Sequence, residues 1–77
     1  MNENLALKIS MLPENPGVYV MLDKFGTVIY VGKAKVLKNR VKQYFYSNKK
    51  PEKVAAMVAN IADFYYIITT SEIDALS

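Results

Sequence analysis

The 77-residue sequence contains no cysteine and no histidine. Without cysteine there is no disulfide framework and no thiolate metal site. Without histidine, imidazole base catalysis and histidine-ligated metals are excluded as well. A small domain without disulfides fits a reducing compartment, so we expect a cytoplasmic protein.

Long apolar runs are also missing. None approaches the ~20 residues that a membrane-spanning helix needs, and the first ten residues, MNENLALKIS, lack the positive start of a signal peptide. Hydrophobic residues make up 52% of the chain, which is enough material for a core. We therefore predict a single small folded domain over residues 1–77, with no membrane association.

Positive charge is concentrated in one segment. Eight of the ten basic residues fall between Lys33 and Lys53, where Glu52 is the only acid, so this segment has a formal net charge of +7. The rest of the chain carries −4, which leaves the overall +3. Such a patch predicts a polyanionic partner, nucleic acid first. A solvated lysine-rich surface is the alternative.

A β-hairpin is predicted near the start of the chain. Two runs rich in Val, Ile and Tyr, residues 17–23 and 27–32, are separated by three residues that end in Gly26. A two- or four-residue loop places Tyr19 opposite Tyr30. A three-residue loop with a left-handed Gly26, which local turn preference favours, places them on opposite faces. In that case only a bulge would restore a shared face.

Three short helices are expected around the hairpin. Residues 3–11 have helical spacing, with Asn2 or Asn4 as the cap. Another helix, the last of the three along the chain, should begin near Pro51. Residues 36–46 have an apolar residue at every fourth position, which predicts a helix packed on the sheet through Leu37, Val41 and Phe45.

Residues 63–70 are dense in aromatic and β-branched residues and predict a third strand. Because this strand is apolar on both faces, we expect it to be the central one. Residues 71–74 resemble a capping box that opens another helix. We therefore expect the natural protein to continue beyond Ser77.

Several polar residues are candidates for a site. Arg40 and Tyr44 lie four residues apart along the predicted basic helix, and Lys33 lies seven residues before Arg40. Taken singly each has an ordinary structural explanation, since tyrosines often pack in sheets with the hydroxyl at the rim. Residues 32–35 do not form a phosphate loop, because the second glycine and the hydroxyl are missing. Three lysines are expected on the outer surface as DNA contacts: Lys35, Lys38 and Lys42.

Together these segments resemble the GIY-YIG nuclease family. Residues 17–19 (GVY) and 30–32 (YVG) are similar to the two tripeptides of its signature, and Arg40 and Tyr44 to its second motif. More narrowly, the sequence resembles the N-terminal domain of UvrC-type subunits of bacterial excision nucleases, from about Ile9 to Ser77. The blocks that carry this resemblance are Leu12–Tyr19, Val28–Lys35, Asn39–Val41 and Thr70–Glu72.

The resemblance implies an α/β (α+β) fold, in which a small three-stranded antiparallel sheet is flanked by helices. It also implies hydrolysis of DNA phosphodiester bonds that depends on Mg²⁺ or Mn²⁺, with the incision made 3′ of a lesion in damaged double-stranded DNA. The implied partner is UvrB, with UvrA acting upstream, through other regions of a longer protein. The catalytic residues carried over from the family motifs are Tyr19, Tyr30, Lys33, Arg40 and Tyr44.

These residue types suit the chemistry. Arg40 can hold two phosphate oxygens through its forked guanidinium. Lys33 can lower the pKa of a nearby tyrosine by favouring the phenolate. Tyr30 or Tyr19 could then accept the proton of the attacking water, and we favour Tyr30 because Lys33 is nearer to it in sequence. Tyr44 would position phosphate or water.

In one respect the sequence departs from the family. The family's metal ligand is a glutamate on the helix that begins near Ser71, and we expect its counterpart just beyond Ser77, because Glu72 and Asp74 lie too early to match it. We therefore expect the 77-residue chain to hold metal poorly and to have little or no nuclease activity. The alternatives are a non-catalytic, basic nucleic-acid-binding module and another nuclease of the same family.

Overall fold

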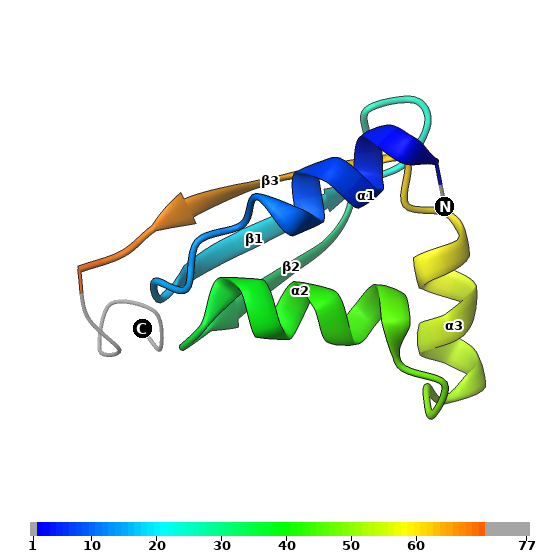
Figure 1. Cartoon of the computed structure of the whole chain (residues 1–77). Helices are drawn as coiled ribbons and strands as arrows, with labels where there is room; N and C mark the ends of the chain where they lie inside the picture. Colours follow the sequence, from blue (N-terminus) through cyan, green and yellow to red (C-terminus); the bar gives the residue numbers. More distant parts are fainter. Residues whose placement is uncertain (1, 71–77) are drawn as a thin grey trace.

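The computed structural model describes residues 2–70. The elements are α1 (Glu3–Ser10), β1 (Gly17–Leu22), β2 (Val28–Ala34), α2 (Leu37–Tyr46), α3 (Glu52–Ala59) and β3 (Asp63–Ile68) (Figure 1). The strands form one antiparallel sheet in the order β2-β1-β3. This confirms the predicted α/β (α+β) fold with three antiparallel strands flanked by helices. The helix predicted from residue 71 lies outside the described residues.

The central strand is β1, which pairs with both β2 and β3. The expectation that residues 63–70 form the central strand was therefore wrong. An apolar strand sequence indicates how its side chains lie relative to solvent. How many neighbouring strands it pairs with depends on the topology of the sheet. In β1 the run Tyr19–Met21 is buried, while four large residues of β3 are exposed: Tyr65, Tyr66, Ile67 and Ile68.

Helix α1 begins at a side-chain cap. The Asn2 side chain accepts a hydrogen bond from the Leu5 N–H at 2.8 Å, so Asn2 rather than Asn4 is the cap. Leu5 and Ile9, four residues apart, are both buried. No helix within residues 2–70 is long and apolar enough to cross a bilayer.

Lys8, in the last turn of α1, ties this helix to β3. Its ammonium group forms an ion pair with Asp63 and donates a hydrogen bond to the Phe64 carbonyl at 2.7 Å. It also lies 5.1 Å from the centroid of the Phe64 ring. The hydrogen bond from Lys8 holds the pKa of Asp63 below its ordinary value.

One hydrophobic core lies between the sheet and the helices. Leu37 and Val41 of α2 are completely buried and Phe45 packs against them, as their spacing predicted. Met57 and Val58 of α3 pack against the same core. Figure 1 shows α1 and α2 on one side of the sheet, with α3 at the end nearer the β1–β2 turn. We call the side of the sheet that they pack on the helix-covered face; its buried residues include Tyr19, Met21 and Phe64.

The described helices leave the opposite side of the sheet uncovered, and we call it the open face. By strand alternation it carries a set of apolar side chains that are about half exposed: Val28, Val31, Tyr65 and Ile67. Val20, in the central strand, lies on the same face and is buried. Both faces of the sheet are therefore apolar, but the described helices pack on only one, and on that face Tyr66 and Ile68 toward the end of β3 remain exposed.

The hairpin turn is the three-residue loop that local preference favours. The Asp23 N–H donates a hydrogen bond to the Thr27 carbonyl at 2.9 Å, and Gly26 has a φ of 79°. The Asp23 carboxylate accepts hydrogen bonds from the N–H groups of Phe25 and Thr27, each at 2.9 Å. These contacts hold the turn in one conformation.

A bulge in β2 then changes the register. The pairing shifts between Met21 and Leu22, which makes Ile29 an extra residue and pairs Tyr30 with Met21. Because Tyr19 and Met21 share a face, Tyr30 also lies on the helix-covered face. The structure thus combines the favoured turn with the bulge that the shared face requires.

Candidate active site

Three tyrosines from three different elements meet on the helix-covered face. Tyr44 of α2 lies between the other two: hydrogen bonds link its hydroxyl to that of Tyr19 in β1 at 3.3 Å and to that of Tyr30 in β2 at 3.1 Å. The ring centroids are 5.6 to 6.1 Å apart, with tilted planes. We call these residues the tyrosine cluster.

The cluster runs from the core to the surface. Tyr19 is 1% exposed, Tyr44 is partly buried, and Tyr30 is 37% exposed. A substrate that approaches from solvent therefore reaches Tyr30 first.

Both glycines of the signature tripeptides are required by space. Gly32 pairs with Tyr19, and a Cβ atom at Gly32 would lie 2.2 Å from the Cζ and hydroxyl oxygen of that ring. A Cβ atom at Gly17 would lie 2.4 Å from the Ile67 carbonyl oxygen in β3. Glycine at position 32 thus lets the Tyr19 ring cross over β2 toward Tyr44.

The environment keeps Tyr19 and Tyr30 protonated. Burial, followed by the hydrogen bond with Tyr44, raises the pKa of Tyr19 well above its ordinary value. The hydrogen bond with Tyr44, followed by burial, raises the pKa of Tyr30. The positive charge of Arg40 acts in the opposite direction and lowers the pKa of both hydroxyls. At neutral pH Tyr19 and Tyr30 are therefore neutral phenols.

Lys33 lies outside this arrangement. It pairs with Val18, one residue out of phase with Tyr19, so its position in β2 belongs to the open face. The cation that acts on Tyr30 is Arg40. The pKa of Tyr30 is raised overall, and the catalytic role expected for Lys33 stays a prediction.

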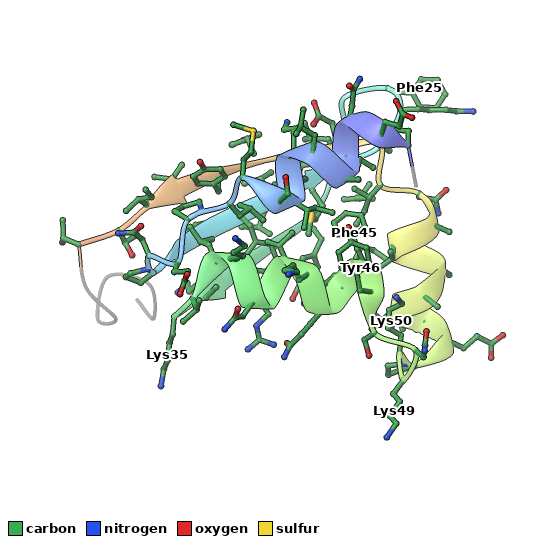
Figure 2. The ribbon with its side chains drawn as sticks, viewed as in Figure 1. Phe25, Lys35, Phe45, Tyr46, Lys49 and Lys50 are labelled. Atoms are coloured by element: carbon green, nitrogen blue, oxygen red, sulfur yellow. The ribbon has the colours of Figure 1, made fainter. Side chains whose placement is uncertain are left out.

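The lysines predicted to contact DNA lie on α2 or just before it. Lys35 and Lys42 are exposed, and Lys38 is partly buried. Figure 2 shows Lys35, near the start of α2, extending away from β3. The basic helix thus presents charge to solvent while its apolar stripe packs on the sheet.

A cavity of about 390 Å³ lies beside Tyr44, between α2 and the start of α3. Residues 47–50 were not singled out from the sequence, although three of them line this cavity. The available signal was their position within six residues of Tyr44, inside the segment of +7 charge. The polar residues that line the cavity are Arg40, Gln43, Tyr44, Ser47, Lys49 and Lys50.

Residues 2–70 bring no cluster of metal-ligating side chains together. No three acidic or histidine side chains in this part of the chain are grouped so that they could hold a metal. Among residues 2–70, no carboxylate lines the cavity and none is hydrogen-bonded to the hydroxyls of the tyrosine cluster. Mg²⁺, by contrast, is normally held by carboxylate oxygens. The glutamate ligand that the resemblance implies lies outside the described residues.

Comparison with known proteins identifies the family. Residues 15–77 match the sequence profile of the UvrC-like GIY-YIG domain. The chain belongs to this family. It is 61% identical over 70 residues to the UvrABC system protein C of Clostridium perfringens (strain SM101), and 60% identical over 74 residues to that of Clostridium botulinum (strain Hall). These alignments cover 90% and 95% of this chain but 11% and 12% of the two relatives.

Solved structures of the family share the fold. The GIY-YIG N-terminal endonuclease domain of UvrC from Thermotoga maritima, bound to magnesium as its catalytic divalent cation, matches with a TM-score of 0.84 at 38% identity. The match covers 99% of this chain and 82% of that one. Three further structures of the same domain each replace a different tyrosine with phenylalanine and contain the catalytic divalent cation.

Proposed function

We propose that this chain is the GIY-YIG endonuclease domain of a UvrC-type excision nuclease. It would hydrolyse a phosphodiester bond 3′ of a lesion in damaged double-stranded DNA, with Mg²⁺ or Mn²⁺ as cofactor and with UvrA and UvrB as partners of the complete protein. The observation that carries the proposal is the tyrosine cluster, whose Tyr44 lines one cavity together with Arg40. The likeness to metal-bound endonuclease domains supports it.

The described residues divide the work in the following way. Arg40 binds non-bridging oxygens of the scissile phosphate and compensates the charge of the transition state. Tyr30 accepts the proton of the attacking water, because its hydroxyl is the exposed end of the cluster. Tyr30 must first release its own proton to solvent, to which it is exposed; Arg40 favours that release, while the hydrogen bond with Tyr44 opposes it.

The remaining residues have supporting parts. Tyr44 orients Tyr30 and contacts phosphate or water, and Tyr19 holds Tyr44 from the core. For Lys33, which is exposed, we propose a contact with the DNA backbone at the end of β2. Lys35, Lys38 and Lys42 add backbone contacts along α2. Because residues 2–70 contain no group of three acidic side chains that could hold a metal, we propose that the 77-residue chain alone is weakly active or inactive.

A chimaera tests the proposal. Residues 1–70 replace the corresponding segment of the Clostridium perfringens relative, to which the chain is 61% identical. Incision of a duplex with a single lesion is then measured with UvrA, UvrB and either Mg²⁺ or Mn²⁺. We expect incision 3′ of the lesion, and a loss of about 10²-fold or more in Arg40→Ala.

The control is Lys24→Ala, which removes a positive charge at the hairpin turn. It should leave incision almost unchanged. If Arg40→Ala weakens only DNA binding and the bound complex still cuts at the same rate, the domain is a nucleic-acid-binding module and the catalytic proposal is wrong. Robust Mg²⁺-dependent incision by the 77-residue chain alone would contradict only the proposed impairment.

A further inference from the structure

The cavity beside Tyr44 has the chemistry of an anion site. Its lining includes three cations, Arg40, Lys49 and Lys50, and within the described chain it includes no acid. The hydroxyls of Tyr44 and Ser47 and the amide of Gln43 add hydrogen-bonding groups. One end of the cavity contains the arginine that we assign to the scissile phosphate, so the cavity continues that site toward α3.

The two lysines in the connection between α2 and α3 are in different situations. Lys50 is partly buried. Its ammonium group donates a hydrogen bond to the Phe45 carbonyl at 3.4 Å, close to the end of α2. A cation at this position satisfies a carbonyl of the last helical turn and complements the helix dipole. Lys50 therefore already has a structural role.

Lys49, by contrast, is exposed. Its backbone N–H donates a hydrogen bond to Ser47 Oγ at 3.2 Å, and the Ser47 N–H donates one to the Gln43 carbonyl at 3.1 Å, so its backbone is held. Between residues 2 and 70, no hydrogen bond or ion pair holds its ammonium group. Figure 2 shows Lys49 extending from the connection on the same side of the molecule as Lys35.

We propose that the connection between α2 and α3 binds a second phosphate of the DNA strand, with Lys49 as its principal contact and Lys50 as a positioning residue. Ser47 follows Arg40 by seven residues, which corresponds to about 10 Å along a helix axis. The second phosphate is therefore one or two nucleotides from the phosphate that Arg40 binds. This inference rests on the proposed function and adds a binding position to the same site.

The test is DNA binding by the 77-residue chain across a range of salt concentrations. Each phosphate contact to duplex DNA contributes about 0.9 to the slope of log K against log salt. We expect Lys49→Ala to reduce the slope by about this amount and to weaken binding several-fold at low salt. Lys49→Arg should restore the slope, because guanidinium also binds phosphate.

The matched control is Lys53→Ala. It removes the same charge from an exposed position of α3 that does not line the cavity. It should leave the slope unchanged, because it removes only long-range attraction. If both variants change the slope equally, or if neither does, the inference is wrong.

Lys50→Ala separates structure from binding. We expect it to lower the urea midpoint of unfolding, and Lys49→Ala to leave that midpoint unchanged. In the chimaera, Lys49→Ala should raise KM and leave kcat unchanged. A loss of kcat equal to that of Arg40→Ala would contradict the assignment to a neighbouring phosphate.

The binding assay also separates the two proposals, because it needs no incision. A missing slope difference refutes the second phosphate position and leaves the nuclease proposal standing. If the chimaera binds but does not cut, the nuclease proposal fails and the phosphate position stands.

Discussion

Both faces of the sheet carry apolar side chains, but the two faces differ in how far these side chains are buried. On the helix-covered face Tyr19, Met21 and Phe64 are at most 1% exposed, whereas on the open face Val31 and Ile67 are 56% and 58% exposed. The cluster, which brings together hydroxyls from β1, β2 and α2, lies on the covered face. Apolar composition alone therefore does not locate the site. Packing does, because the buried Tyr19 ring and the partly buried Tyr44 ring hold the linked hydroxyls in place.

The largest difference between the faces should appear along β3. Phe64→Ala removes a ring that is 1% exposed and lies 6.3 Å from the Phe45 ring, and should cost about 3 to 5 kcal/mol of unfolding free energy. Ile67→Ala, on the open face of the same strand, should cost less than about 1 kcal/mol. Urea unfolding measures both. Equal losses would mean that the open face is covered in solution.

Adjacent residues of β2 sharpen the same comparison. Gly32→Ala places a methyl group against the Tyr19 ring on the covered face and should cost about 1 to 3 kcal/mol. Val31→Ala, one residue earlier on the open face, should cost less than about 1 kcal/mol. The Gly32 variant should also perturb the near-ultraviolet circular dichroism of the tyrosines. An unperturbed spectrum with full stability would show that the ring has room to move.

Ionisation of Tyr19 gives the covered face its own pH dependence. Because its pKa is raised in the folded protein, its contribution is complete below the ordinary tyrosine pKa of about 10 and is lost as pH rises above it. Stability should fall by about 1.4 kcal/mol per pH unit above about pH 10 for each such tyrosine. Urea unfolding at about pH 8 and about pH 11 measures the fall. It should be smaller in Tyr19→Phe, and an identical fall would assign the effect to other groups.

The smallest effect belongs to the ion pair between Lys8 of α1 and Asp63 at the start of β3. Asp63→Asn should cost at most about 1 kcal/mol, because the Lys8 and Asp63 side chains are about half exposed and solvent screens the pair. The pKa of Asp63 is lowered by its hydrogen bond from Lys8, so the contribution is present above about pH 4 and is lost as pH falls through the folded pKa. Thermal unfolding of the variant and the parent should therefore converge in acid.

Much of the framework was predictable because it depends on local preference. Helical spacing identified Leu37 and Val41 as buried residues of α2, and Gly26 predicted the three-residue turn. The role of β3 was misjudged, since its two apolar faces say nothing about how many strands it pairs with. Lys49 was passed over because a polar loop in sequence gives no sign of the cavity beside it.

The sequence by itself determined the kinds of element, their order, the family motifs and the segment of concentrated positive charge, since these depend on spacing and composition along the chain. Only the tertiary structure decided the bulge at Ile29, which brings Tyr30 to the face of Tyr19. The alternation of side chains along a strand does not reveal where an extra residue is inserted, because the position of a bulge depends on which side chains the helices bury. Strand alternation then places Lys33, adjacent to Gly32 in sequence, on the other face.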